Sequence, residues 1–314
     1  MSILVAITGW DSAPWLEALK AALPGHAIAT PDTLTDRASI RYAVCWRQTP
    51  SSLADLPSLQ AIFSLGAGID HLFHDPYLPA APIVRLVDPD LRDRMGEWVV
   101  LHVLLHHRQQ RRYDRQQWER IWRDDADQPA AAEVRVSIMG LGELGRDAAR
   151  KLALIGFDVA GWSASAKSEP GIACFHGLDG LDAMLARTDI LVALLPLTPA
   201  TRGILNADLF AKLAHDGRLG GPVLINAGRG GLHVEADVVS ALASGVLAGA
   251  SLDVFEQEPL PESSPLWRHP SVYVSPHNAA LSAPRAVARY IAGQIAAFER
   301  GEPLRNVVER ARGY

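Results

Sequence analysis

The chain has 314 residues, of which 48% are hydrophobic and 21% are charged, and its formal net charge at neutral pH is −5. This length allows two domains of ordinary size, each with a hydrophobic core of its own. The composition is typical of a globular protein in water, and the acidic balance argues against nucleic acid or a membrane surface as a partner. A small molecule is therefore the expected partner.

The cysteines and the first residues predict a cytoplasmic protein without a metal site. Cys45 and Cys174 are far apart and form no CxxC pair, so neither a disulfide framework nor a zinc site is indicated. The apolar run near the N-terminus is short and has no basic segment before it, which is typical of a first strand and not of a signal peptide. No apolar run approaches the roughly 18 residues of a membrane helix.

Strand-like and helical segments alternate in the first part of the chain. Strands are expected at 3–8, 43–46, 61–65 and 83–87, with a helix at 15–23, and this alternation predicts a parallel sheet covered by helices. Residues 95–122 contain neither glycine nor proline after Gly96, which predicts one long helix or two between domains.

A second alternating series begins at Val134. Strands are expected at 134–139, 158–162, 190–195, 223–226, 250–255 and 272–275, with helical patterns between most of them. Six such strands predict a doubly wound sheet. An amphipathic helix then follows Pro284, ends at Gly301, and is expected to pack on the first domain.

A glycine-rich loop follows the expected strand 134–139. Gly140, Gly142 and Gly145 form G-x-G-x-x-G at the start of an expected helix. Such glycines permit a tight turn and let a pyrophosphate approach backbone N–H groups at the positive end of the helix. They could instead serve only the close packing of strand and helix. The context favours a dinucleotide site, with further contacts expected from Glu143, Leu144, Trp162, Leu195, Pro196, Asn226 and Ala227.

The end of the next strand bears on which dinucleotide is bound. An acidic residue about 20 positions after the loop normally binds the ribose 2′-hydroxyl of NAD. Ser163 stands there instead, followed by Ser165 and Lys167, so the segment offers hydroxyls and a cation and no carboxylate. This set can accommodate a 2′-phosphate. The sequence therefore favours NADP(H), with NAD(H) possible.

Three later segments each follow an expected strand and carry one ionisable side chain of interest: Arg229, Glu258 and His277. Ligands of an open α/β sheet bind at the carboxyl ends of the strands, so these side chains are expected to lie together. Arg229 can bind a carboxylate and polarise a carbonyl, and His277 can donate a proton as hydride arrives from a nicotinamide. Glu258 can orient the imidazole and favour its protonated form. Each residue alone could be structural, but the three together predict the reduction of a 2-oxo acid.

In its motifs the chain resembles the D-isomer-specific 2-hydroxyacid dehydrogenases over nearly its whole length. The glycine loop, N-x-x-R-G, D-V-F-x-x-E-P and S-P-H occur in the order and at the spacing of that family. Within the family the chain is most similar to the glyoxylate/hydroxypyruvate reductase A group. That group shares S-L-G-A-G-I-D-H at 64–71, W-S-x-S-x-K-S at 162–168, P-L-W-x-H-P at 265–270 and R-A-R-G-Y at 310–314.

The resemblance implies an α/β fold with two Rossmann-like domains on doubly wound parallel sheets. Residues 1–98 plus 283–314 would form a flavodoxin-like substrate (catalytic) domain, discontinuous in sequence. Residues 99–282 would form the dinucleotide-binding Rossmann domain. The active site would lie in the cleft, where closure excludes water. The family also forms homodimers, which would cover the apolar face of the helix near 98–106.

The resemblance also implies roles for individual residues. Arg229, Glu258 and His277 would be catalytic, and Arg229 and His277 would also bind the substrate. The backbone N–H groups of Ala67 and Gly68 would hold the substrate carboxylate, as main-chain donors in a glycine-rich turn can.

Three further positions follow from the resemblance or lie beside its motifs. Asp253 would hold the nicotinamide carboxamide. Trp46 follows an expected strand and is a candidate wall of the substrate pocket, with core packing as the alternative. Close relatives carry arginines where this chain has Ala164 and Ala166, which leaves Lys167 as the nearest cation for a 2′-phosphate.

The expected activity is NAD(P)H-dependent reduction of small 2-oxo acids, with glyoxylate to glycolate and hydroxypyruvate to D-glycerate as the leading reactions. One alternative is a non-catalytic NAD(H)-binding regulator of the same fold. Another is a dehydrogenase for D-lactate or a bulkier 2-hydroxy acid.

Two other patterns are given structural interpretations. His102 and His106 stand four residues apart on an expected helix, but no H-E-x-x-H pattern or third ligand accompanies them, so no metal is predicted. The basic stretch 108–123 contains aromatic residues, yet a solvated helix face or a dimer edge is favoured over RNA binding in this acidic chain.

Overall fold

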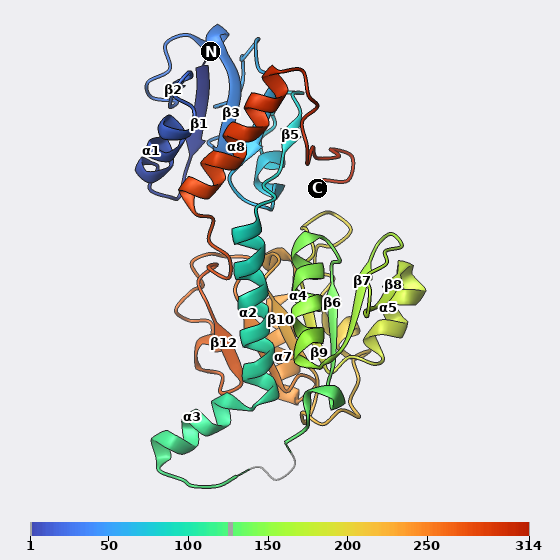
Figure 1. Cartoon of the computed structure of the whole chain (residues 1–314). Helices are drawn as coiled ribbons and strands as arrows, with labels where there is room; N and C mark the ends of the chain where they lie inside the picture. The colour runs from blue at the N-terminus through green and yellow to red at the C-terminus, as the bar shows by residue number, and fades with distance from the viewer. Residues whose placement is uncertain (1, 125–127, 314) are drawn as a thin grey trace. The chain divides into compact units, whose positions relative to one another are not determined.

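The computed structural model describes residues 2–124 and 128–313. The chain forms two compact units, which we call unit 1 (Met1–Leu91 with Leu281–Tyr314) and unit 2 (Arg92–Ala280). Each unit contains one parallel sheet with helices against it, as Figure 1 shows. The predicted α/β class with two doubly wound sheets is therefore confirmed.

Unit 1 is built on a five-stranded sheet with the order β2-β1-β3-β4-β5, which is the flavodoxin-like order. The central strands are buried on both faces, as in parallel sheets generally. The strands are β1 (Ser2–Ile7), β2 (Ala27–Ala29), β3 (Ile40–Trp46), β4 (Ala61–Ser64) and β5 (Ile83–Val84). The strand β2 was not predicted, because it is three residues long and lies at the sheet edge.

Two helices of unit 1 lie side by side although they are far apart in the sequence. They are α1 (Ala13–Ala22) and α8 (Pro284–Glu299). Burial along α8 follows helical spacing, with Val287, Ile291 and Ile295 fully buried. The C-terminal helix thus completes the core of the unit formed by the N-terminal segment.

Unit 2 is built on a seven-stranded parallel sheet with the order β12-β11-β10-β9-β6-β7-β8. The strand order reverses between β6 and β9, as in Rossmann folds, where ligands bind beyond the carboxyl ends of the strands. The strands are β6 (Arg135–Met139), β7 (Asp158–Ser163), β8 (Ala173–His176), β9 (Ile190–Ala193), β10 (Val223–Asn226), β11 (Gly249–Leu252) and β12 (Val272–Val274). The exposed edge strand β8 was not predicted.

Helices cover both faces of this sheet. One buried cluster joins the sheet to α5 (Gly177–Leu185), α6 (Ala207–Phe210) and α7 (Glu235–Ser244). A second cluster joins the opposite face to α2 (Pro89–His107) and α4 (Glu143–Ile155). Short 3-10 turns lie at Arg37–Ser39, Asp70–His74, Ala131–Glu133, Gly230–Leu232 and Pro265–Arg268.

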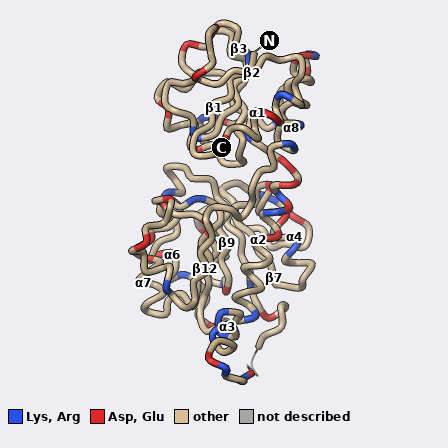
Figure 2. The backbone as a smooth tube through the Cα atoms, turned by 90° about the vertical axis from the view of Figure 1, so that its left-hand side faces the viewer, with Lys and Arg blue, Asp and Glu red and all other residues tan. Residues whose placement is uncertain are grey.

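The helical segment expected at 95–122 consists of two helices and begins earlier than expected. The first helix, α2, starts at Pro89, and α3 spans Gln110–Glu119. Gln109 separates them in a left-handed conformation with φ of 52°. Basic and acidic side chains are mixed along α3 (Figure 2), which is typical of a solvated helix.

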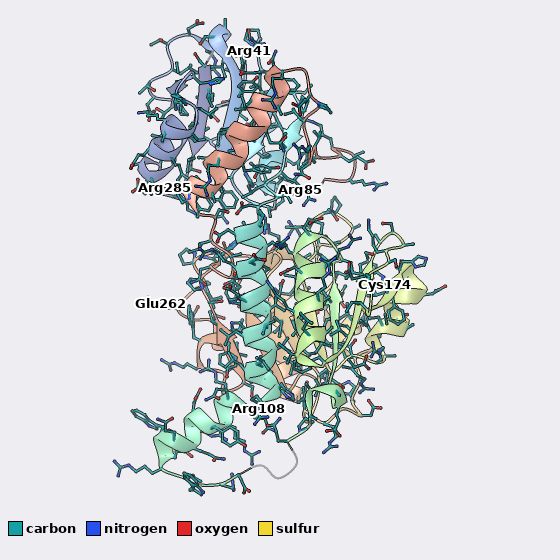
Figure 3. The ribbon with its side chains drawn as sticks, viewed as in Figure 1. Arg41, Arg85, Arg108, Cys174, Glu262 and Arg285 are labelled. Carbon is teal, nitrogen blue, oxygen red and sulfur yellow. The ribbon has the colours of Figure 1, made fainter. Side chains whose placement is uncertain are left out.

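Both cysteines are free thiols. Cys45 is buried in β3, and Cys174, labelled in Figure 3, lies on β8. Within 2–124 and 128–313 no helix has the length and apolarity needed to cross a bilayer. The same residues contain no cluster of three or more His, Cys, Asp or Glu side chains able to hold a metal ion.

Candidate active site

The carboxyl ends of three neighbouring strands in unit 2 lead into the segments that carry the predicted catalytic residues. Arg229 follows β10, Glu258 follows β11 and His277 follows β12. These three strands are adjacent in the sheet. Residues that are nearly 50 positions apart in sequence therefore leave the same edge of one sheet.

The imidazole of His277 is bonded to the carboxylate of Glu258. The ring nitrogen Nδ1 lies 3.0 Å from both Oε1 and Oε2. Because a carboxylate only accepts hydrogen bonds, Nδ1 carries the hydrogen, and Nε2 is the nitrogen left to exchange a proton with a ligand. The His277 side chain is 32% exposed and that of Glu258 22%. The pair is thus partly shielded and has the geometry of an oriented acid.

The loop that carries His277 is held by the buried carboxylate of Asp253. Oδ1 accepts hydrogen bonds from the Ser275 hydroxyl at 2.6 Å and from the Asn278 N–H at 3.0 Å, and Oδ2 accepts one from the Ala279 N–H at 3.0 Å. The His277 N–H donates to the Asp253 carbonyl at 2.8 Å. These bonds hold His277 in a left-handed conformation with φ of 53°, which is unfavourable for a residue with a side chain. Sequence reasoning missed this role of Asp253.

Arg229 lies in a tight turn between two glycines that have no room for a side chain. A Cβ on Gly230 would lie 1.9 Å from the Phe255 carbonyl carbon, and one on Gly228 would lie 2.9 Å from the Leu195 carbonyl oxygen. The turn is therefore packed backbone to backbone against the ends of β9 and β11. Its arginine remains partly exposed.

Asn226, at the end of β10, holds the same turn. Its side chain is fully buried, and Oδ1 accepts from the Gly228 N–H at 3.0 Å. Nδ2 donates to the Arg229 carbonyl at 3.0 Å and lies 2.9 Å from Nδ1 of His233. The hydrogen-bonding groups of the Asn226 side chain are thus bonded to other protein atoms. His233 was not identified from the sequence.

The three glycines of the loop after β6 meet different surroundings. A Cβ on Gly140, where φ is +110°, would lie 2.7 Å from the Leu194 carbonyl oxygen, and one on Gly145 would lie 1.9 Å from the Gly140 carbonyl oxygen. Gly142 has no atom within 4 Å of such a Cβ and is exposed. Close packing explains Gly140 and Gly145 but not Gly142. An open approach to the N-terminus of α4, which begins at Glu143, is what a bound pyrophosphate requires.

The segment after β7 presents a mostly exposed set of small and polar side chains. Ser163 is buried and donates its hydroxyl hydrogen to the Ser165 carbonyl at 2.8 Å. Residues 164–168, including Ser165 and Lys167, are exposed. No acidic side chain occurs between Ser163 and Ser168. The segment therefore offers one cation and hydroxyls to an anionic group.

The other residues predicted to contact the cofactor at this edge of the sheet differ in solvent exposure. Glu143 is exposed, and Leu144 and Pro196 are partly exposed, whereas Leu195 and Ala227 are buried. The Trp162 ring is buried in the core and donates its indole N–H to the Gly177 carbonyl at 2.8 Å.

The predicted substrate residues of unit 1 gather at one loop. Trp46 is 8% exposed and stacks on Trp10 with ring centroids 4.2 Å apart. Gly66 lies so close to Trp46 that a Cβ would approach Cζ3 to 2.4 Å. Ala67 and Gly68 follow directly and are partly exposed. Trp46 therefore packs beneath the loop whose N–H groups were predicted to bind a carboxylate.

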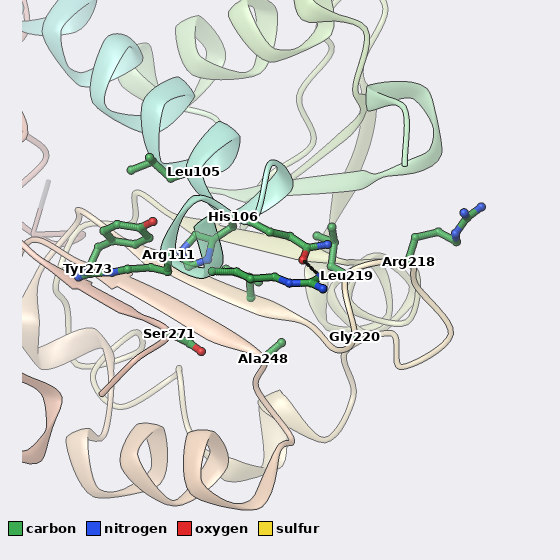
Figure 4. A pocket seen from close by; sticks show the side chains of 12 residues that line it. Leu105, His106, Arg111, Arg218, Leu219, Gly220, Ala248, Ser271 and Tyr273 are labelled. Carbon is green, nitrogen blue, oxygen red and sulfur yellow. Dashed lines mark hydrogen bonds between the residues drawn. The ribbon is translucent and has the colours of Figure 1, made fainter. Parts of the chain in front are cut away.

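A pocket of about 400 Å³ in unit 2, shown in Figure 4, lies away from these residues. Val223, Ala248 and Ser271 line it at the amino ends of β10, β11 and β12, the edge opposite to the candidate site. Arg111 reaches across it to donate to the Val272 carbonyl at 2.6 Å and lies 4.1 Å from the centroid of the Tyr273 ring. Arg111 is thus bonded within the protein.

Two of the three histidines of α2, His102 and His106, hold that helix to the sheet. His102 Nδ1 lies 2.8 Å and His106 Nε2 lies 2.9 Å from the Ser251 hydroxyl on β11. Burial lowers the pKa of His102 to about 4 and that of His106 to about 3, so both rings are neutral at neutral pH. His102 and His106 therefore each have a hydrogen-bond partner in Ser251, which is a structural role for both.

Comparison with known proteins gives a consistent result. Residues 100–279 match the model of the NAD-binding domain of D-isomer-specific 2-hydroxyacid dehydrogenases. The chain is 39% identical to glyoxylate/hydroxypyruvate reductase A of Salmonella newport (strain SL254) over 100% of both chains.

Two solved structures are also similar to the chain. One is an NADPH-dependent glyoxylate/hydroxypyruvate reductase from Sinorhizobium meliloti in complex with NADP and sulfate, with 49% identity, a TM-score of 0.94, and coverage of 100% of this chain and 99% of that chain. The other is a probable 2-hydroxyacid dehydrogenase from Rhizobium etli CFN 42 in complex with NADP, HEPES and L(+)-tartaric acid, with 46% identity, a TM-score of 0.95 and the same coverage.

The contrast between Gly142 and Gly145 gives a test of dinucleotide binding. Gly142→Ala should change the free energy of unfolding by less than about 1 kcal/mol, because its Cβ meets no protein atom, but should raise the Kd for a dinucleotide at least about tenfold. Gly145→Ala should lower stability by about 1–3 kcal/mol, because its Cβ collides with backbone. Thermal unfolding and fluorescence titration with NADPH would measure both. Unchanged affinity in Gly142→Ala would show that no pyrophosphate lies against this loop.

Proposed function

The chain belongs to the D-isomer-specific 2-hydroxyacid dehydrogenase family, and from that premise we propose that it reduces small 2-oxo acids to D-2-hydroxy acids with NADP(H). Glyoxylate and hydroxypyruvate are the proposed substrates, since relatives of the same length that act on them share 39% and 49% of its sequence. The observation that carries the proposal is the His277–Glu258 pair at 3.0 Å, formed by the segments after β12 and β11, beside β10, the strand that leads to Arg229.

In this proposal Arg229 and His277 both act on the 2-oxo acid: Arg229 binds it and His277 donates a proton to it. The planar guanidinium of Arg229 binds the substrate carboxylate and polarises the 2-oxo group. His277 donates the proton on Nε2 to the carbonyl oxygen as charge develops there. The bound cofactor supplies the hydride that reduces the carbonyl carbon. Arg229 thus favours the 2-oxo acid class over simple aldehydes and ketones.

Glu258 supports the protonated imidazole from the other side of the ring. Its carboxylate accepts the Nδ1 hydrogen and so fixes the orientation in which Nε2 can reach a substrate. A negative charge at 3.0 Å also stabilises the positive charge that the ring carries before it donates its proton. This arrangement suits carbonyl reduction.

We propose that the cofactor lies along the carboxyl edge of β6, β7 and β9. The open face at Gly142 and the start of α4 suit the pyrophosphate. Ser165 and Lys167 are exposed beyond β7, where a 2′-phosphate would need partners, and no carboxylate there would repel it. The solved relatives from S. meliloti and R. etli contain NADP. Asp253 remains a proposed partner of the nicotinamide carboxamide, because its carboxylate has lone pairs beyond those used by residues 275–279.

For the substrate carboxylate we also propose the main-chain N–H groups of Ala67 and Gly68. They follow Gly66, whose own N–H is taken by the Ser64 hydroxyl at 3.2 Å. Trp46 packs against Gly66 and would keep the shape of this loop. Two backbone donors beside each other favour a small anion such as a carboxylate.

The direct test is the initial rate of NADPH and NADH oxidation with glyoxylate, hydroxypyruvate and pyruvate. We expect turnover with the first two acids and a higher kcat/KM with NADPH, because Lys167 can pair with the 2′-phosphate. A higher kcat/KM with NADH would show that Lys167 and the two serines do not suffice without arginines at 164 and 166. Tight dinucleotide binding without turnover would reject the enzyme in favour of a regulator, and selective turnover of pyruvate or bulkier acids would change the substrate.

Substitutions at the acid pair test the assignment of roles. His277→Ala should lower kcat by roughly 10²–10⁴-fold, because the proton donor is lost. Glu258→Gln should lower kcat at least about tenfold, because a neutral amide no longer stabilises the charged ring. Glu256→Gln is the matched control, since this exposed carboxylate pairs with Arg202 on the surface. Near wild-type kcat in His277→Ala, or equal losses in the two Glu variants, would contradict the mechanism.

We propose that the protein is a homodimer that uses the end of α3 and the residues just after it. Trp118 is 89% exposed, Trp122 is fully exposed and Ile121 is 45% exposed. Large apolar side chains gathered on a surface in this way are typical of protein–protein contacts. The first turn of α3 is fixed to the sheet through Arg111, which would present these side chains on a stable support.

The molar mass in solution tests the dimer. Changing Trp118 and Trp122 together to Glu should convert a dimer to a monomer in light scattering after gel filtration, because two buried charges would oppose association. Leu178→Glu on α5, which is 81% exposed, should leave the mass unchanged. A monomeric wild-type protein, or a double variant that remains a dimer, would rule out this interface.

A further inference from the structure

His233 is a buried histidine that the proposed mechanism does not use. It lies directly after the 3-10 turn Gly230–Leu232 and is 3% exposed. Its Nδ1 is 2.9 Å from Nδ2 of Asn226, and its ring meets that of Phe255 edge-on with centroids 6.3 Å apart. The Val234 N–H donates to the Leu205 carbonyl at 3.0 Å, so the backbone beside the ring is fixed. The ring is thus held in place on several sides.

The bonds of Asn226 decide which atoms of the two side chains donate. The Gly228 N–H can only donate, so the atom that it meets must be the amide oxygen of Asn226. The Arg229 carbonyl can only accept, so the atom beside it must be the amide nitrogen. That nitrogen carries two hydrogens, and its second one faces His233 Nδ1. His233 must therefore be an acceptor at Nδ1 and carry its hydrogen on Nε2.

The surroundings of the ring favour this neutral form. Burial lowers the pKa of His233 to about 4, so the ring is uncharged at neutral pH. Its Nε2 is buried and has no hydrogen-bond partner within the part of the chain that the structure describes. A buried donor without a partner is unfavourable, and an aliphatic side chain would avoid that cost. Fold stability alone therefore does not account for a histidine at this position.

We infer that His233 is a positioning residue for Arg229. By accepting the second amide hydrogen of Asn226, it holds that amide in the one orientation that bonds both the Gly228 N–H and the Arg229 carbonyl. The Asn226 amide then bonds the backbone of the turn 226–229 on its buried side. The backbone of Arg229 is thereby fixed, which limits the positions that its guanidinium can take. This inference rests on the proposed function, in which Arg229 binds the substrate carboxylate.

Two substitutions separate the hydrogen bond from the volume of the ring: Asn keeps the acceptor but has less volume, and Leu keeps most of the volume but has no acceptor. His233→Asn keeps an acceptor where Nδ1 stands, whereas His233→Leu removes it. With glyoxylate, His233→Leu should raise KM about tenfold, because loss of one hydrogen bond loosens the turn. The Kd for NADPH should stay within about twofold, and His233→Asn should stay near wild type in both. In an Arg229→Lys background, His233→Leu should add little, because coupled residues are not additive.

Hydrogen exchange gives a measurement that does not depend on activity. Peptides that cover 226–231 should exchange about tenfold faster in His233→Leu than in wild type or His233→Asn, because the Gly228 N–H loses its acceptor when the Asn226 amide turns. Unchanged exchange and KM in His233→Leu would overturn the inference, as would equal changes in both variants. If the wild-type protein does not reduce 2-oxo acids, the proposed function fails, and exchange alone decides whether His233 holds the turn.

Discussion

The buried carboxylate of Asp253 is the interaction on which the candidate site depends most. A charged group in the protein interior is costly unless hydrogen bonds compensate it, and the loop after β12 supplies three donors within five residues. Those bonds determine the path of that loop and so hold His277 in its left-handed conformation. Asp253 directly follows β11. Its side chain therefore connects the end of that strand to the loop that carries the His277 imidazole. The position of His277 is therefore set by the core of unit 2.

The same construction occurs one strand away. Asn226 ends β10, as Asp253 follows β11, and its buried amide closes the turn that carries Arg229. In both places a polar side chain at a strand end turns inward and bonds the backbone just beyond it. Such side chains fix the loops that carry Arg229 and His277 from the interior of unit 2. Arg229 and His277 thus share a support made of the neighbouring strands β10 and β11.

Much of this could be predicted from the sequence, and the gaps have physical reasons. Buried central strands appear as apolar runs, so the second series was located strand by strand except for β8, an exposed edge strand with little apolar pattern. The break at Gln109 has no glycine or proline to signal it. Residue types at strand ends predicted the acid pair and the arginine. They did not distinguish a side chain that faces a ligand from one that faces the core, as Trp162 shows, and they did not indicate His233, whose role arises only from contacts made after folding.

The exposed segment 164–168 has a consequence for how this protein can change over generations. Its side chains point to solvent, and Ser163 alone is buried, so substitutions there would disturb few internal contacts. Arginines can therefore be gained or lost at 164 and 166 without destabilising the sheet, whereas the glycines beside Arg229 have no such freedom. In the proposed function, where this segment contacts the 2′-phosphate, a few single-residue steps would therefore be enough to exchange NADP(H) for NAD(H). Under that proposal the coenzyme could change in evolution while the turn that carries Arg229 stays as it is.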